Sequence, residues 1–305
     1  ARPLINALAN TFMGAGYENI ADYPKINIQL EFCGIENIHA VRNSFKKMQV
    51  NVSCSNDGTY LFNNIHESMW YNTIAIILLS SYKIYNSIKG NCNVLIHCSD
   101  GWDRTTQLSA TAQLLLDSYF RTIDGFICLI EKEWLSFGHQ FRYRNGMYSQ
   151  VDSPPNVAAS NQFSPIFIQW LDCIYQIMNQ NYSSFQFNFN LLEFLAEEIF
   201  SGKYGTFLFN NEKERDQYNA REKTLSIWTY VKFNEKKFIN PIYDSNPIRR
   251  PLIMNYKCIK LWNEYFYRFD SFPNYLEDYN KEIQNSKNII NNDGSNINST
   301  SGQKK

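Results

Sequence analysis

The stretch that decides the fold reads VLIHCSDGWDRTT and covers residues 94–106. The short apolar run 94–96 is typical of a buried strand, and from Arg104 onward apolar side chains recur at helical spacing. A longer amphipathic helix is expected ahead of the strand, at 67–88. The order of helix, strand, tight loop and helix predicts an α/β fold.

Within this stretch, Cys98 and Arg104 are separated by five residues. A loop that leads from a strand into a helix turns backbone N–H groups inward, and the helix dipole adds partial positive charge, so an anion binds there. The same field lowers the pKa of Cys98, which makes this thiol a candidate nucleophile. Arg104 can return over the loop and hold two phosphoryl oxygens with its planar fork. The spacing therefore predicts a site for a phosphate ester.

The loop also holds two carboxylates, Asp100 and Asp103. A leaving alkoxide needs a proton, and one of these residues is expected to supply it as general acid. We assign this role to Asp103, next to Arg104, and the same residue would deprotonate the water that attacks the cysteinyl-phosphate. Gly101 relieves crowding in the turn, and Trp102 offers an aromatic wall. This chemistry predicts no metal and no other cofactor.

The composition is that of a globular protein, with 44% hydrophobic residues in 305. Because 29 basic residues balance 29 acidic ones, no overall field attracts nucleic acid, and none is expected as a partner. The seven cysteines are an odd number without zinc-site spacing, which favours reduced thiols in a cytosolic protein. The apolar run 74–79 is too short to span a membrane. The chain opens at Ala1 without an initiator methionine, so we expect a fragment.

Periodicity predicts the remaining elements. A strand is expected at 25–33, where apolar and polar residues alternate, and a loop at 50–64. Helices are expected at 37–48, 125–137, 164–179, 189–201 and 256–267. The last residues, 281–305, are rich in Asn, Ser and Lys and are predicted to be a disordered tail, which leaves one phosphatase domain at 1–280.

The loop sequence HCSDGWDRT resembles the signature of the myotubularin phosphoinositide phosphatases. Similar stretches lie at 2–19, 32–45, 129–141, 164–176 and 205–208, so the resemblance covers about residues 1–270. It implies a cysteine-dependent, protein tyrosine phosphatase-like fold, with a central sheet among many helices. It also implies removal of the 3-phosphate from phosphatidylinositol 3-phosphate and phosphatidylinositol 3,5-bisphosphate.

The resemblance further implies where and with whom the protein acts. The expected location is the cytoplasm, peripheral to endosomal membranes, where the partner is a phosphoinositide headgroup. Homo- or hetero-oligomers with other myotubularin-like proteins are expected as well. The family's upstream PH-like domain and the first part of its catalytic domain are expected to be missing from this fragment.

Site residues carry over position by position. Cys98 matches the nucleophile, Arg104 the phosphate-binding arginine and Asp103 the proposed acid. The substrate-binding positions are Asn10, Asn37, Ile38, the loop residues Ser99, Asp100, Gly101 and Trp102, and Arg144, which would reach a second headgroup phosphate. Gln140 departs from the family pattern, because active members carry an arginine there. For Asn37 a helix cap is the alternative interpretation, and for Asn10 a structural amide.

Three alternatives to a lipid phosphatase stay open at this point. One is a catalytically inactive regulator, although inactive members typically lack the loop Cys or Arg that this chain has. Another is a protein tyrosine phosphatase, which shares the Cys and Arg spacing but not the Asp-Gly-Trp-Asp interior. The third is a lipid-binding or scaffolding module.

Overall fold

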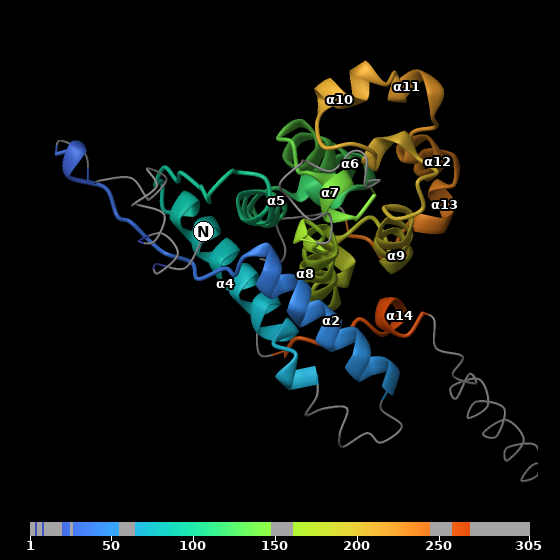
Figure 1. Ribbon diagram of the computed structural model, residues 1–305. Coiled ribbons are helices and arrows are strands. Elements are labelled where there is room, and N and C mark those ends of the chain that lie inside the picture. Colours follow the sequence, from blue (N-terminus) through green and yellow to red (C-terminus); the bar gives the residue numbers. More distant parts are fainter. Residues whose placement is uncertain are drawn as a thin grey trace, which may run out of the picture. The chain divides into compact units, whose positions relative to one another are not determined.

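The computed structural model describes residues 20–24, 27–54, 65–147, 161–244 and 258–268, together with Leu4 and Leu8. The chain divides into two compact units, Ala1–Phe266 and Tyr267–Lys305. All the elements named below belong to the first unit (Figure 1). The predicted tail at 281–305 lies outside the described residues.

Helices dominate the described part of the first unit. In chain order the elements are η1 (Ile20–Asp22), α2 (Ile38–Cys54), α4 (Trp70–Lys89), α5 (Arg104–Leu116), η2 (Ser118–Arg121), α6 (Ile123–Ile130), η3 (Glu131–Ser136), α7 (Phe141–Arg144), α8 (Ile166–Gln180), η6 (Tyr182–Ser184), α9 (Phe189–Glu198), η7 (Gly205–Phe207), α10 (Glu212–Gln217), α11 (Ala220–Lys223), α12 (Ile227–Phe233), α13 (Glu235–Phe238) and α14 (Asn263–Phe266).

Helix α8 lies in the core of the unit. All its residues from Ile166 to Met178 are buried, which is typical of a helix that is covered on every side. The Trp170 ring on this helix stacks on Phe126 of α6, with the ring centroids 5.5 Å apart, and packs against Trp134 at 5.1 Å. Helices α4, α5 and α9 also contact α8. The loop that precedes α5 therefore leads into a helix that packs against this buried core.

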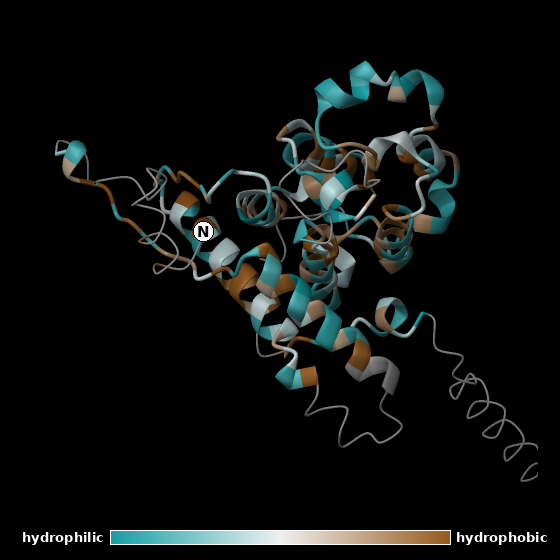
Figure 2. Cartoon of the chain, viewed as in Figure 1, coloured by the Kyte–Doolittle hydropathy of each residue, from teal (hydrophilic) through white to brown (hydrophobic). Residues whose placement is uncertain are grey.

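Most predicted helices are confirmed, with shifted ends. Helix α2 buries Val41, Phe45 and Met48 of the apolar stripe that predicted it and continues to Cys54, so the loop expected at 50–64 begins later. Residues 55–64 lie outside the described residues. Helix α4 begins at Trp70 rather than 67, because Met69 has a left-handed backbone with φ 62°. Figure 2 shows that each of these helices carries both hydrophobic and hydrophilic residues.

Two predicted helices differ more from the structure. The helix expected at 125–137 is α6 followed directly by η3, a π-helix of six residues. Such wide turns are rare and are often found at functional sites. Of the helix expected at 256–267, the described residues form only the short α14.

The predicted central sheet is not confirmed. In the described residues of the two expected strands, 27–33 and 94–96, the backbone is in no strand, and the strand-like pairing seen elsewhere in the description is limited to the isolated bridges Phe187–Ile239 and Tyr204–Leu225. The prediction that 94–96 is buried is wrong, because Leu95 is 80% exposed. Apolar alternation marks a segment that can become a strand, but a strand needs a paired neighbour.

None of the described helices is long and apolar enough to cross a membrane.

Candidate active site

The loop between Cys98 and Arg104 leads directly into α5, and Asp103 is the N-cap position of that helix. Gly101 has φ +88°, a left-handed conformation that favours glycine. The turn brings the Gly101 N–H to within 3.3 Å of the Cys98 sulfur, to which it donates. The Thr106 hydroxyl donates to the carbonyls of Gly101 and Trp102, at 3.3 and 3.1 Å. The loop is thus held in a tight turn around the cysteine.

The environment of Cys98 favours its thiolate. The thiol is 8% exposed, and burial, the largest single effect, raises its pKa. Hydrogen bonds from the Thr105 side chain and backbone and from the Gly101 N–H, together with the charge of Arg104, outweigh burial, so the pKa of Cys98 is lowered. The Thr105 hydroxyl is buried and has no other hydrogen-bond partner in the described part of the chain, so it is available to the sulfur of Cys98. A lowered pKa is what a nucleophilic cysteine needs.

Arg104 returns over the loop, as the sequence predicted. Its Nη2 donates to Ser99 Oγ at 3.2 Å and its Nη1 to the Ile35 carbonyl at 3.5 Å. The guanidinium therefore lies beside the turn that holds Cys98, with donors close to where phosphoryl oxygens would be bound. The contact with Ile35 also joins the segment before α2 to the loop.

Asp103 is held on both of its carboxylate oxygens by residues far along the chain. Arg144 donates from Nε to Oδ1 at 3.1 Å and from Nη2 to Oδ2 at 2.9 Å, a bidentate pair. The Nδ1 of His139 lies 3.1 Å from Oδ1 and 2.9 Å from the Trp102 carbonyl. Since both neighbours are acceptors, Nδ1 of His139 carries a proton. The loop is therefore tied to α7 and to the residues just before it.

This arrangement changes the electrostatics of Asp103. Burial raises the pKa of its carboxyl, but the charge of Arg144 and the hydrogen bond and charge of His139 outweigh burial and hold the pKa well below its usual range. A general acid must carry a proton at the working pH. The assignment of Asp103 as acid therefore does not fit the described geometry, in which Asp103 is an ionised anchor.

The expected role of Arg144 also needs correction. This residue is 3% exposed, and its remaining Nη1 donates to the carbonyl and Oε1 of Gln162, at 3.1 and 2.9 Å. An arginine with three nitrogens engaged inside the protein is not placed to bind a second headgroup phosphate. Gln140 lies four residues earlier and is partly exposed, and its carbonyl accepts the Arg144 N–H at 2.8 Å.

The other predicted substrate-binding positions fall into three groups. Ser99 and Asp100 are exposed loop residues beside Cys98, and Trp102 is half-buried. Asn37 is a helix cap, since its Oδ1 accepts the N–H groups of His39 and Ala40 at 3.0 and 3.1 Å, and the Ile38 carbonyl accepts from Ser164 at 2.8 Å. The alternative interpretation of Asn37 is thus the one that the contacts favour. Asn10 lies outside the described residues.

Sequence reasoning missed His139 as part of the site. It is fully buried, edge-on to Trp134 at 4.7 Å and to Phe141 at 4.8 Å. Its position directly before Gln140, which the resemblance had singled out, is the one signal in the sequence that could have pointed to it. Only the fold reveals the contact with Asp103, which is 36 residues earlier in the chain.

Comparison with known proteins gives consistent matches. The model of the myotubularin-like phosphatase domain matches residues 1–216. The chain is 38% identical over 273 residues to a Xenopus laevis protein named myotubularin, covering 88% of this chain and 44% of that protein. It is 38% identical over 275 residues to human phosphatidylinositol-3,5-bisphosphate 3-phosphatase MTMR6, covering 88% and 42%. A Caenorhabditis elegans phosphatidylinositol-3,5-bisphosphate 3-phosphatase, mtm-1, is 40% identical over 276 residues, covering 89% and 45%. The chain spans less than half the length of these curated relatives.

Proposed function

This chain belongs to the myotubularin-like phosphatase family, and on that premise we propose that it removes the 3-phosphate from phosphatidylinositol 3-phosphate and phosphatidylinositol 3,5-bisphosphate. The observation that carries the proposal is the Cys98 thiol, whose pKa is lowered inside a turn that Arg104 overhangs. Nucleophile and phosphate-binding cation are thus adjacent on one loop. The relatives named as 3-phosphatases of phosphatidylinositol 3,5-bisphosphate support the choice of substrate.

The proposed reaction has two steps. The Cys98 thiolate attacks phosphorus, the bond between phosphorus and the inositol 3-oxygen breaks, and that oxygen takes a proton from a carboxylic acid. Water then attacks the cysteinyl-phosphate, gives a proton to the carboxylate, and releases inorganic phosphate and the thiolate. Arg104 and the loop N–H groups stabilise the negative charge of the transferring phosphoryl oxygens in both steps. Because these donors supply the stabilising charge, we propose that the reaction is metal-independent.

We assign the proton to Asp100 in place of Asp103. Both lie in the loop, but both carboxylate oxygens of Asp103 are engaged by Arg144 and His139, whereas Asp100 is exposed beside Cys98, where a leaving oxygen can reach it. A missing acid matters most when the leaving group is poor. Asp100→Asn should therefore slow lipid turnover more than turnover of a fast-leaving aryl phosphate, while Asp103→Asn slows both alike. The opposite pattern would return the role of acid to Asp103.

We propose that the protein works at the cytoplasmic surface of endosomal membranes, where the headgroup reaches the loop, and that it can assemble with itself or with other myotubularin-like proteins. The phosphoinositide substrate in the names of the relatives supports a membrane surface as the setting. Binding of the purified chain to vesicles with and without phosphatidylinositol 3-phosphate tests the first part, and analytical ultracentrifugation tests the second.

The experiment that tests the proposed function is phosphate release from short-chain phosphatidylinositol 3-phosphate. The purified chain, shown to be folded by circular dichroism, is compared with Cys98→Ser, and a phosphotyrosine peptide is offered in parallel. Lipid turnover that disappears in Cys98→Ser, with little turnover of the peptide, supports the proposal. Preference for the peptide would indicate a tyrosine phosphatase, and no release from either substrate would indicate a binding or regulatory protein.

A further inference from the structure

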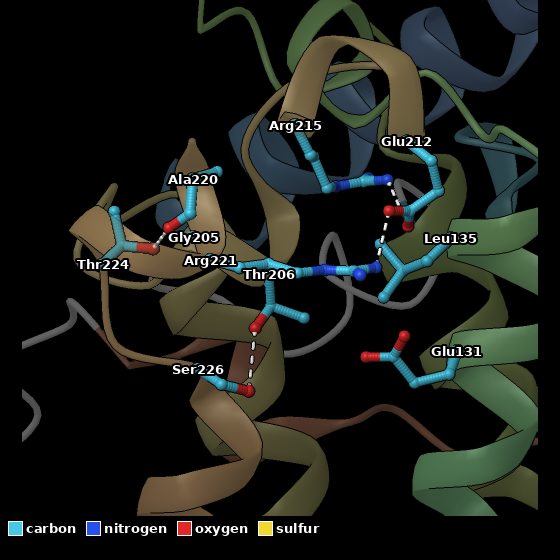
Figure 3. A pocket seen from close by; sticks show the side chains of 10 residues that line it. All are labelled: Glu131, Leu135, Gly205, Thr206, Glu212, Arg215, Ala220, Arg221, Thr224 and Ser226. Atoms are coloured by element: carbon cyan, nitrogen blue, oxygen red, sulfur yellow. Dashed lines mark hydrogen bonds and ion pairs between the residues drawn. The ribbon is translucent and has the colours of Figure 1, made fainter. Parts of the chain in front are cut away.

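A cavity of about 280 Å³ lies apart from the Cys98 loop, among η3, η7, α10, α11 and the start of α12. Two acidic and two basic side chains line it, together with the hydroxyls of Thr206 and Ser226. Figure 3 shows Glu212 between the guanidinium groups of Arg215 and Arg221, with Glu131 on the other side of the cavity. Because the charges balance, net charge attracts no ligand, and recognition must come from the placement of individual donors.

Arg215 is the donor that stands out. Its side chain is only 4% exposed, and Nη1 donates to Glu212 at 3.0 Å. Its Nε and Nη2 are buried, and neither makes a hydrogen bond within the described part of the chain. Burial lowers the pKa of Arg215, yet arginine stays protonated, so these donors belong to a buried cation. Buried polar groups of native proteins are nearly always hydrogen-bonded.

The two donors lie on one edge of the guanidinium, where they match the two oxygens of a carboxylate or phosphate. The same chain shows this edge in use, because Arg144 holds Asp103 through Nε and Nη2 at 3.1 and 2.9 Å. At Arg215 no side chain of the described residues supplies the matching pair of oxygens. The second carboxylate oxygen of Glu212 accepts from Nη2 of Arg221 at 2.6 Å, and Glu131 accepts the indole N–H of Trp228.

We propose that this cavity is a binding site for a small oxyanion, the phosphate or carboxylate group of an organic molecule, held side-on by Nε and Nη2 of Arg215. The hydroxyls of Thr206 and Ser226, 3.4 Å from each other, line the same cavity and offer further donors. The volume exceeds that of a lone phosphate or acetate ion, so the ligand carries further atoms beyond the oxyanion. The site is distinct from the loop that binds the lipid phosphate.

Contacts through η3 connect this cavity to the catalytic loop. Glu131 and Leu135, which line it, belong to η3, and the Trp134 carbonyl of that element accepts the N–H of His139 at 2.9 Å. His139 in turn contacts Asp103. The oxyanion would thus bind beside η3, the element that is hydrogen-bonded to His139, and His139 contacts Asp103 of the catalytic loop.

The side-chain Nε–H signals of the arginines report on the proposal directly. A two-dimensional ¹H–¹⁵N spectrum of the chain is recorded during titration with inorganic phosphate and, separately, with acetate. The Arg215 signal, identified by its loss in Arg215→Lys, should shift saturably. Both probes shifting it indicates an oxyanion site in general, and phosphate alone indicates a phosphate ester as ligand.

Arg215→Lys keeps the charge but removes the edge formed by Nε and Nη2. The dissociation constant of the oxyanion, measured from the signals of other residues that line the cavity, should rise about tenfold to a hundredfold. Arg121→Lys is the matched control, because Arg121 is also buried and its Nε makes no hydrogen bond to any residue that the structure describes, but it lies outside this cavity. It should leave the titration unchanged.

Three results would overturn the proposal: no saturable shift of Arg215 with either probe, an unaltered titration in Arg215→Lys, or equal weakening in Arg121→Lys. A shift of the Arg215 signal in Glu131→Gln without any response to the probes would show that Glu131 closes onto Arg215 instead. Thermal unfolding of each variant confirms that the compared proteins are folded.

Discussion

Removing Arg144 should expose how strongly the catalytic loop depends on its pair with Asp103. Arg144 is 3% exposed and donates twice to a carboxylate of which 13% is exposed. Breaking a buried pair by deleting one partner leaves the other charge unpaired and typically costs about 3–5 kcal/mol. Arg144→Met should therefore lower the free energy of unfolding by about that amount at pH 7.

A double-mutant cycle separates this pair from general damage to the core. In Asp103→Asn with Arg144→Met neither charge remains, so the double variant should lose clearly less stability than the sum of the singles, by about 2 kcal/mol or more. Arg121→Met is the control, because Arg121 is a buried arginine that donates to the Leu114 carbonyl and not to Asp103. Its effect should add to that of Asp103→Asn. Urea unfolding followed by tryptophan fluorescence measures all variants.

The pH dependence of stability tests the pair of Asp103 and Arg144 independently. The pKa of Asp103 is lowered in the folded state, so its contribution to stability is fully present above its unfolded value of 3.8 and is lost as pH falls from there toward the folded pKa. Arg144→Met should flatten this acid limb relative to the wild type. Additive single effects at pH 7, together with an unchanged acid limb, would refute the pairing on which this reasoning rests.

Three further predictions concern other residues. Burial raises the pKa of Asp172 to about 6, against 3.8 in the unfolded chain, so the free energy of unfolding should fall by roughly 3 kcal/mol as pH rises from about 4 to 6. Asp172→Asn should lack this pH dependence, and an equal dependence in urea unfolding of both proteins would contradict the prediction. Gln140→Arg should raise turnover of phosphatidylinositol 3,5-bisphosphate relative to the monophosphate about five- to hundredfold, the value of a charge-assisted contact, and an unchanged ratio would dismiss a role for Gln140 in selectivity. Peroxide should abolish lipid turnover reversibly by oxidising Cys98, while peptide mass spectra should show that the fully buried Cys173, whose pKa is raised, stays reduced. Lipid turnover that resists peroxide would mean that the Cys98 thiol is not activated.

Local patterns in the sequence predicted the helices and the loop well. The stripes of α2 and α4 and the dense apolar content of α8 are properties of neighbouring residues, so they can be recognised without the fold. The return of Arg104 over the loop is likewise a short-range feature, five residues from Ser99. The left-handed Met69 and the change to a π-helix at Glu131 are outcomes of packing, and the pattern there indicated only a helix.

Long-range contacts account for what the sequence could not show. The run 94–96 is apolar enough for a buried strand, yet whether it is buried or paired depends on segments elsewhere, and Leu95 is exposed. Asp103 was read as an acid because its partners, His139 and Arg144, lie 36 and 41 residues later. The resemblance pointed to Arg144 as a headgroup ligand, but it could not tell that the guanidinium of Arg144 faces the loop's own carboxylate.

The measurement that tests the central claim most directly is the capture of the covalent intermediate. The chain is mixed with short-chain phosphatidylinositol 3-phosphate, quenched in acid within a turnover, digested and analysed by mass spectrometry. The peptide that contains Cys98 should gain the mass of one phosphoryl group, and neither Cys98→Ser nor the unmixed protein should show it. Lipid turnover that persists in Cys98→Ser without any phosphorylated cysteine would contradict the account.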